Sequence, residues 1–124
     1  MIHLDTNYIL AALAPDSIAE QRVSSWLRRG ETVAASAAAW GEFLCGPVPH
    51  RDIAAATILV GAPMAFDSRH AEEAARLFNL GGRRRNSFPD CMIAATAMNA
   101  GARLATRNVA DFERFTAHGL RLEA

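Results

Sequence analysis

Lysine is absent from this 124-residue chain, and all 13 of its basic residues are arginines. The absence excludes a phosphate-binding P-loop, a Schiff-base lysine and a serine–lysine dyad, because each of them needs a lysine side chain. The 13 basic residues are balanced by 13 acidic residues, so the formal net charge is zero. A neutral protein has no global field that attracts nucleic acid, and contact with RNA or DNA must therefore use local patches.

Cysteine is scarce, since Cys45 and Cys91 are the only two, and they form no CxxC pair. We expect no structural disulfide and interpret both as small buried apolar side chains. The chain starts in strand-like sequence without a secretory leader, and no apolar run is long enough to span a bilayer. A cytoplasmic protein without membrane association is therefore expected.

Hydrophobic residues make up 51% of the chain, enough for one core, so we expect a single domain over residues 1–124. Short apolar runs alternate with segments of helical periodicity, which predicts an α/β fold with a mainly parallel sheet of four to five strands. The strands are expected at residues 2–4, 32–35, 64–66, 103–106 and 120–122. The helices are expected between Thr6 and Pro15, over 18–30, from Ser36 through Leu44, over 51–60, around 71–80, from Ser87 to Gly101 and over 112–117.

Two of these helices carry apolar patterns that predict a buried face. The first pattern consists of Ile18, Val23, Trp26 and Leu27. The second has i, i+3, i+4, i+7 spacing and consists of Ala71, Ala74, Ala75 and Phe78. Three helices are each preceded by a serine that is expected to cap the N-terminus, namely Ser17, Ser36 and Ser87.

Four acidic side chains are expected to meet at one edge of the sheet. Asp5 directly follows the first strand, while Asn108 and Asp111 follow the fourth. Asp90 lies in the first turn of a helix, and Glu42 lies one to two turns into the helix after the second strand. In open parallel sheets ligands bind beyond the carboxyl ends of the strands, and helices that enter from that edge begin there. The four carboxylates therefore converge on one rim.

Carboxylates that lie close together repel one another unless a cation neutralises them. Mg²⁺ or Mn²⁺ prefers hard oxygen ligands, keeps several waters, and needs as few as two carboxylates. Such an ion activates water and polarises a phosphoryl group, so phosphodiester hydrolysis needs no serine, cysteine or histidine nucleophile. The four histidines show no metal-ligand spacing. The pattern thus indicates a metal-dependent nuclease.

Each acidic residue also has an ordinary structural interpretation. Asp5 is suited to accept backbone hydrogen bonds in a turn. Asp90 stands three residues after Ser87, which is the spacing of a capping box, and Asp111 is suited to cap a short helix. Glu42 is compatible with a solvated helix face. The local sequence around the four residues decides between these interpretations and a shared site.

Four segments carry a family resemblance, namely Ile-His-Leu-Asp-Thr-Asn at 2–7, Trp-Gly-Glu-Phe at 40–43, Asp-Cys-Met-Ile-Ala-Ala-Thr-Ala at 90–97 and Thr-Arg-Asn-Val-Ala-Asp-Phe at 106–112. In this order and at these separations the chain resembles the PIN-domain ribonucleases, specifically the VapC-like toxins of bacterial toxin–antitoxin pairs. The resemblance runs nearly from end to end. It implies a three-layer α/β/α sandwich and Mg²⁺- or Mn²⁺-dependent cleavage of single-stranded or looped RNA.

The resemblance also implies roles for the acidic residues. Asp5 and Asp90 match the main metal ligands of the family, and Glu42 matches the acid that completes the site directly or through water. Some members have Asp where this chain has Asn108. We therefore assign the fourth acidic position to Asp111, with Asn108 as a neutral supporting ligand or orienting group.

Further expectations concern neighbouring residues and partners. Thr6 is placed to hydrogen-bond a ligand carboxylate or merely to satisfy a turn. The loop Arg83–Arg85 either grips RNA phosphates or is simply solvated. The resemblance implies a homodimer and a small inhibitory antitoxin. The surface that receives the antitoxin is predicted to draw on Ile53, Ile58, Leu59 and Val60, although core packing also explains them.

Rival classes fit the sequence less well. An aspartyl-phosphate phosphatase needs a second Asp where Asn7 stands and also a lysine, and a receiver domain needs the same lysine. A dinucleotide-binding fold needs a glycine-rich turn after the first strand. Two alternatives stay open, a non-catalytic PIN-fold binding module and an RNA-processing nuclease without an antitoxin.

Overall fold

The computed structural model describes all residues from Met1 to Ala124. Three short strands form the sheet, namely β1 (Ile2–Leu4), β2 (Val33–Ala34) and β3 (Arg103–Ala105). The helices are α1 (Thr6–Ala12), α2 (Ile18–Arg28), α3 (Ala37–Cys45), α4 (His50–Val60), α5 (Ser68–Leu80), α6 (Phe88–Asn99), α7 (Val109–Phe112) and the 3-10 helix η1 (Glu113–His118). None of the helices is long and apolar enough to cross a membrane.

The sheet has the order β2-β1-β3, and both strand pairs are parallel. The predicted strands at 64–66 and 120–122 each contribute a single parallel bridge, Ser36 with Met64 and Leu104 with Leu122. Residues 65–67 turn directly into the N-terminal cap of α5, so the first of these segments is too short to pair further. The predicted parallel α/β fold is confirmed, with three full strands extended by two bridges.

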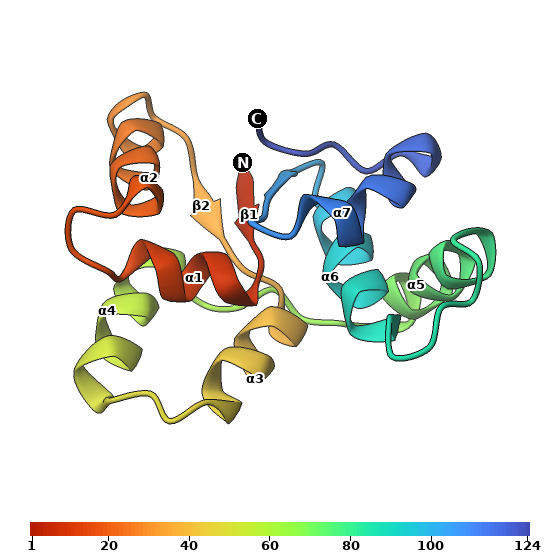
Figure 1. The fold of residues 1–124 in the computed structure, drawn as a ribbon, viewed down its shortest axis with the longest axis horizontal. Helices are drawn as coiled ribbons and strands as arrows, with labels where there is room; N and C mark the ends of the chain where they lie inside the picture. Colours follow the sequence, from red (N-terminus) through yellow and green to blue (C-terminus); the bar gives the residue numbers. More distant parts are fainter.

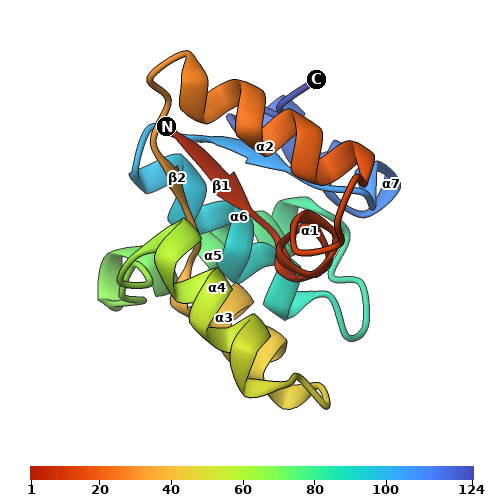
Figure 2. The same cartoon turned by 90° about the vertical axis from the view of Figure 1, so that its left-hand side faces the viewer.

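Helices cover the sheet on both sides. In Figure 1, α2 and α4 lie to the left of β1 and β2 and α1 runs below these strands, whereas α6 and α7 lie to the right with α5 outside them. Figure 2, turned by 90°, shows α4 in front of the strands and α6 behind them, and β1 leading directly into α1. The buried core runs through both layers and includes Ile2, Leu4, Phe43, Leu104 and Phe115. This is the expected three-layer α/β/α arrangement.

Two of the three predicted serine caps form, at Ser17 and Ser36, whereas Ser87 makes no side-chain cap. The Ser17 hydroxyl accepts a hydrogen bond from the Glu20 N–H at 3.0 Å, and the Ser36 hydroxyl accepts one from the Ala39 N–H at 3.0 Å. The Glu20 carboxylate reaches the N–H of Asp16 instead of that of Ser17. These side chains satisfy N–H groups that the first helical turn leaves without partners.

The predicted buried faces are partly wrong. On α2 the buried residues are Ala19, Val23 and Trp26, while Ile18 is 77% exposed and Leu27 is 47% exposed. On α5 the buried residues are His70, Ala74 and Leu77, and Ala71 and Ala75 are exposed. The buried His70 ring accepts a hydrogen bond from the Asp67 N–H, which turns this face of α5 inward. Alanine gains too little from burial to fix the orientation of a helix.

Both cysteines are free, but only Cys91 is buried. The expectation that Cys45 is also buried is wrong, because this residue ends α3 just before the exposed Gly46–Pro47 turn. Cys91 lies in α6, whose residues Cys91 and Ile93 to Ala97 are all buried. This helix packs between β3 and α5 and carries Asp90 at its start.

Candidate active site

Asp5 is held at the junction of β1 and α1. It is 3% exposed, and one carboxylate oxygen, Oδ1, accepts a hydrogen bond from the Tyr8 N–H at 2.8 Å, which caps α1. The predicted structural role of Asp5, accepting a backbone hydrogen bond in a turn, is therefore confirmed. This hydrogen bond uses only one of about four lone-pair sites on the carboxylate.

The second oxygen of Asp5 accepts a hydrogen bond from the Thr106 hydroxyl. The register of the parallel sheet explains this contact, since Leu4 pairs with Ala105 and the next residue of each strand follows at the same edge. The Thr106 hydroxyl also accepts a hydrogen bond from the Asn108 N–H at 2.9 Å. The two strand ends are thus joined by one side chain.

Glu42 reaches the same edge from α3. Its carboxylate accepts a hydrogen bond from the Thr6 hydroxyl at 3.0 Å. Thr6 is the first residue of α1, directly after Asp5, and its hydroxyl lies 3.4 Å from the Ala39 carbonyl oxygen as well. The predicted hydrogen bond from Thr6 to an acidic side chain is confirmed.

Asp90 lies in the first turn of α6 and is not part of a capping box. Ser87 precedes the helix, but it makes no side-chain cap and its hydroxyl donates to the Arg84 carbonyl at 2.6 Å. The structural interpretation of Asp90 is therefore wrong. Its carboxylate is left free for another use at the positive end of α6.

Asp5, Glu42 and Asp90 line one small cavity of about 130 Å³, which we call the acidic cavity. The complete lining consists of Asp5, Thr6, Asn7, Glu42, Asp90, Ile93, Asn108 and Phe112. Three of the four predicted acidic residues and the predicted supporting residue Asn108 are thus brought together. No salt bridge in the structure involves any of these carboxylates.

Asp111 lies on the other side of Asp90. Together these two acids line an adjoining cavity of about 190 Å³, which we call the arginine pocket. The complete lining consists of Arg84, Arg85, Asn86, Ser87, Asp90, Asp111 and Arg114. Asp111 is in the short helix α7 and does not cap a following helix, contrary to its structural interpretation. The expected single cluster of four acids is thus divided, with Asp90 shared between two cavities.

Burial and mutual repulsion perturb the two central acids. The pKa of Asp90 is raised from 3.8 to about 6, first by burial and then by the negative charges of Asp111 and Glu42, while Arg114 opposes the shift. The pKa of Asp5 is also raised, chiefly by burial, although the hydrogen bonds from Thr106 and Tyr8 act against the increase. Both carboxylates would gain from a nearby cation.

The donor set suits a hard divalent cation. No three histidine, cysteine, aspartate or glutamate side chains lie close enough to hold one ion together. A magnesium ion is usually bound by only one or two carboxylates and keeps several waters, so it does not need three acidic ligands. Carboxylate and amide oxygens are present in the acidic cavity, and its lining contains no sulfur or imidazole ligand. The site therefore favours Mg²⁺ or Mn²⁺ over zinc.

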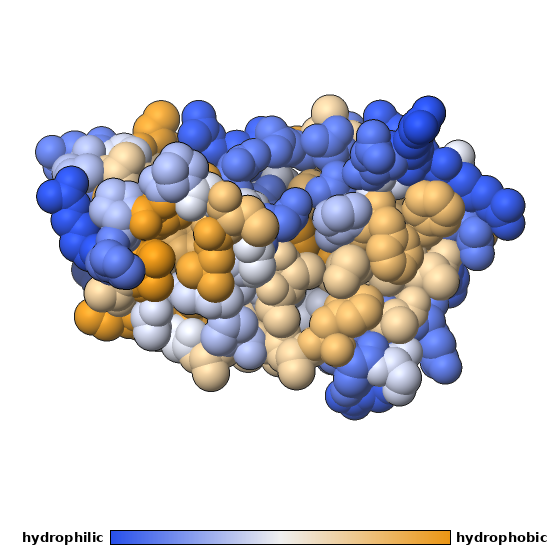
Figure 3. All heavy atoms as spheres, turned by 90° about the horizontal axis from the view of Figure 1, so that it is seen from below, coloured by the Kyte–Doolittle hydropathy of each residue, from blue (hydrophilic) through white to orange (hydrophobic).

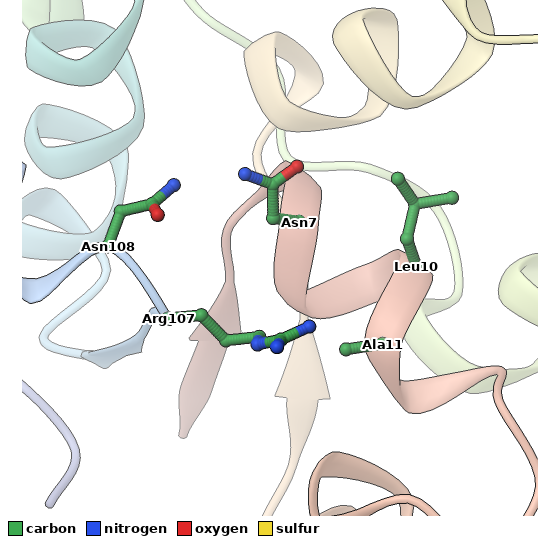
Figure 4. Close-up of a pocket in the computed structure, with 5 residues that line it drawn as sticks. All are labelled: Asn7, Leu10, Ala11, Arg107 and Asn108. Atoms are coloured by element: carbon green, nitrogen blue, oxygen red, sulfur yellow. The ribbon is translucent and has the colours of Figure 1, made fainter.

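A larger cavity of about 450 Å³ adjoins the acidic cavity through Asn7 and Asn108, which line both. Figure 4 shows the two side-chain amides on facing sides of this cavity, with the Arg107 guanidinium extending below them toward Ala11. Leu10 supplies an apolar wall. Arg107 lowers the pKa of Asp5, so its positive charge acts on the acidic cavity.

The sequence analysis assigned no role to three residues near the site, namely Thr106, Arg107 and Arg114, although the first two belong to the motif at 106–112. The first two directly follow β3, so the rule that placed Asp5 at the sheet edge could have identified them. Arg114 is in η1, outside every motif, and its position depends on how that helix packs against the loop before α6. No sequence signal would have found it.

A parallel sheet between helical layers, with acids at its carboxyl edge, defines an α/β domain with a candidate metal site. The chain belongs to the PIN domain family, because a profile of that family matches residues 2–117. This membership confirms the resemblance from which the roles of Asp5, Glu42 and Asp90 were inferred. A search of curated proteins gives no match.

Several solved structures share this fold. FitAcB from Neisseria gonorrhoeae is 25% identical with a TM-score of 0.72, and the match covers 99% of this chain and 97% of that one. VapBC2 from Rickettsia felis, bound to a DNA fragment from its promoter, is 21% identical with a TM-score of 0.73 and coverages of 99% and 98%. A toxin–antitoxin complex from Klebsiella pneumoniae is 23% identical with a TM-score of 0.71 and coverages of 90% and 90%.

Proposed function

We propose that this chain is a metal-dependent endoribonuclease that acts as the toxin of a toxin–antitoxin pair. The observation that carries the proposal is the acidic cavity, which Asp5, Glu42 and Asp90 line together and in which none of the three forms a salt bridge. Membership of the PIN domain family supports the nuclease, and the similarity to a toxin–antitoxin complex supports the biological role.

The side chains of the acidic cavity have different proposed roles in binding a Mg²⁺ or Mn²⁺ ion. Asp5 and Asp90 are the proposed direct ligands, and Glu42 is proposed to act through water, because no three acidic side chains lie close enough to hold one ion. Asn108 contributes a neutral oxygen. Asp111, on the far side of Asp90, is proposed to act through Asp90 or through a water. A bound ion would supply polarisation of a phosphoryl group and activation of water.

The protein's own contribution is to orient these ligands before the substrate arrives. Asp5 is fixed by hydrogen bonds from Tyr8 and Thr106, and Glu42 is fixed by Thr6. Such supporting hydrogen bonds fix the direction of the free lone pairs. Asp90 is positioned by the backbone of α6 alone, which leaves all of its oxygen lone pairs for a ligand.

The decisive test measures cleavage of a labelled RNA pool by the wild-type protein with Mn²⁺ or Mg²⁺, and again after chelation. Asp5→Ala and Asp90→Asn should each lose about 100-fold or more in rate. The matched control is Asp16→Asn, which changes an exposed acid in the turn before α2. Equal cleavage with metal, without metal and by Asp5→Ala would overturn the assignment and favour a non-catalytic PIN-fold module.

The toxin role needs a separate test. Expression of the wild-type chain in a bacterial host should arrest growth, and Asp90→Asn should not. Co-expression of the product of an adjacent short gene should restore growth. RNA cleavage in vitro without growth arrest would instead favour an RNA-processing nuclease that has no antitoxin.

The proposed antitoxin surface is the apolar face of α3 and α4. Figure 3 shows this side of the molecule, where hydrophobic side chains form a broad exposed area. In these two helices, Ile58 is 86% exposed and Leu44 is 45% exposed. Val60 is buried, and Ile53 and Leu59 pack against the core, so most of the predicted patch is structural. Exposed apolar areas of this kind mark interaction sites.

Self-association is also proposed, as a homodimer. Sedimentation of the purified chain should give the mass of two protomers of 13.4 kDa each. A monomer at all concentrations would contradict this part of the proposal, and it would leave the nuclease assignment unaffected.

A further inference from the structure

We infer that the arginine pocket is a phosphate-binding subsite, which holds the RNA phosphate next to the one positioned for cleavage. The inference rests on the proposed function. It adds a second contact between the protein and the RNA strand, outside the acidic cavity. The ligand is one phosphodiester group of single-stranded RNA. The subsite is formed by Arg84, Arg85 and Arg114.

The three guanidinium groups come from two different segments. Arg84 and Arg85 lie in the loop before α6, and Arg114 is in η1. No salt bridge in the structure involves any of the three. Two carboxylates also line the pocket, so three positive and two negative charges leave it with a net charge of +1. The pocket therefore has guanidinium groups available for an anion.

Arg114 gives the most direct indication of a missing ligand. Its Nη2 atom is buried and has no hydrogen-bond partner. The rest of the side chain is fixed, because Nη1 donates to the Asp111 carbonyl and the guanidinium lies 4.2 Å from the centre of the Phe115 ring. Arg114 also lines the arginine pocket, so a phosphate bound there would meet a guanidinium group that is already held in place.

The loop that presents the other two arginines has an unusual backbone. Arg83 has φ 52° and Asn86 has φ 61°, so left-handed residues stand on both sides of Arg84 and Arg85. Asparagine tolerates this conformation, but arginine adopts it rarely. Two hydrogen bonds hold this shape, because the Arg83 N–H donates to the Phe78 carbonyl at 2.9 Å and the Ser87 hydroxyl donates to the Arg84 carbonyl at 2.6 Å. We therefore interpret the loop as part of a site instead of a solvated turn.

The position of the arginine pocket indicates which phosphate of the RNA strand it would bind. Asp90 lines both the acidic cavity and the arginine pocket, so the two are directly adjacent. An RNA strand carries one phosphate for each nucleotide. A strand with one phosphodiester in the acidic cavity would therefore bring a neighbouring phosphate to the arginine pocket. Guanidinium groups bind phosphate oxygens in a bidentate manner, which matches this role.

The first experiment measures binding without cleavage. A fluorescein-labelled single-stranded RNA is titrated by anisotropy at several salt concentrations, with all proteins in an Asp5→Asn background. Arg84→Gln/Arg85→Gln and Arg114→Gln should each weaken binding and reduce the salt slope by about 0.7 for each lost phosphate contact. Arg114→Lys should recover part of the loss. Arg28→Gln, at the exposed C-terminal end of α2, is the matched control and should leave the slope unchanged.

An unchanged slope in Arg84→Gln/Arg85→Gln would overturn the subsite, and this variant is the safer test because both side chains are exposed. An acidic protein segment is the competing ligand, so hexaglutamate is titrated in parallel. Weaker hexaglutamate binding with unchanged RNA binding would also overturn the proposal. It would assign the pocket to a protein partner.

The second experiment uses cleavage and separates this proposal from the proposed function. Single neutral methylphosphonate linkages are placed on either side of the bond that the wild type cuts. One flanking position should slow the wild type by about 10-fold, and the same substitution should have no further effect on Arg114→Gln. Equal slowing of both proteins would overturn the subsite while the nuclease stands. Absence of all RNA cleavage would overturn the nuclease, and the anisotropy result would then decide the subsite by itself.

Discussion

The Thr106 hydroxyl donates a hydrogen bond to the Asp5 carboxylate and so joins two residues that are 101 positions apart in the chain. The same hydroxyl accepts the N–H of Asn108, which begins the segment that leads to α7. One side chain therefore fixes the orientation of a proposed ligand and the position of a second residue in the acidic cavity.

We predict that Thr106→Val lowers the affinity for Mn²⁺ by about 10-fold or more, because loss of a hydrogen bond that supports a ligand typically has an effect of this size. Valine has nearly the same shape, so the core should be retained. The affinity is measured by titration calorimetry of the metal-free protein. Thr57→Val is the matched control, since its hydroxyl donates within α4 to the Ile53 carbonyl. The same loss in both variants would show a general structural effect instead.

A second prediction concerns the cost of keeping Asp90 charged. The pKa of this residue in the folded protein is raised from 3.8 to about 6, so the folded state binds the proton more tightly than the unfolded state. Ionised Asp90 therefore destabilises the metal-free protein at every pH above about 6, and the cost disappears as the pH falls below 3.8. Asp90→Asn should raise the free energy of unfolding by about 1–2 kcal/mol at pH 7.5.

Urea unfolding of both proteins at pH 7.5 and pH 4 measures this difference. The increase in the free energy of unfolding caused by Asp90→Asn should shrink toward zero at pH 4. The control variant Asp16→Asn should show no comparable increase at either pH. Added Mg²⁺ should stabilise the wild type but not Asp90→Asn, because a ligand that binds only the folded state shifts the unfolding equilibrium. A destabilised Asp90→Asn in metal-free buffer would contradict the prediction.

The sequence was sufficient to place three acids at one edge, because a single rule applies to all of them. Asp5 follows a strand, Glu42 is in the helix after a strand, and Asp90 begins a helix that enters from the same edge. In a parallel sheet these positions share one side. The capping serines were predictable for a similar reason, since a cap is a local interaction within a few residues.

The position of Asp111, the buried faces of two helices and the role of Arg114 depend on tertiary packing, which the sequence pattern does not reveal. Asp111 was expected with the other acids, but the short helix α7 places it in the arginine pocket. The buried faces of α2 and α5 differ from the predicted ones, since alanine-rich helices lack the large side chains that would fix their rotation. Arg114 became visible as a site residue only once η1 was placed beside α6.

A third prediction follows from His3, which lies in β1 at the centre of the sheet. It is fully buried, and neither ring nitrogen has a hydrogen-bond partner. Burial lowers its pKa from 6.5 to about 4, and the N-terminal amino group adds to the decrease. The folded state therefore disfavours the proton, so stability falls as the pH drops from 6.5 toward 4 and changes no further below that.

The variant His3→Leu should remove this part of the pH dependence. Between pH 7.5 and pH 4, the wild type should lose about 2–3 kcal/mol relative to His3→Leu, as judged by urea unfolding. His50→Gln changes an exposed histidine at the start of α4 and serves as the control. An equal pH response in wild type and His3→Leu would show that folding does not lower the pKa of this ring.

The last prediction separates Asn108 from Asp111, the two candidates for the fourth position of the site. Asn108 lines the acidic cavity, so Asn108→Ala should weaken Mn²⁺ binding by a similar factor at every pH. Asp111 is the strongest of the charges that raise the pKa of Asp90.

Removal of the Asp111 charge in Asp111→Asn should therefore lower the pKa of Asp90. Protons then compete less with the metal, and Mn²⁺ binding should persist to lower pH than in the wild type. Calorimetric titrations between pH 5 and pH 8 distinguish the two roles. A uniform loss of affinity in Asp111→Asn would make Asp111 a direct ligand, because loss of a ligand lowers affinity whether or not Asp90 is protonated.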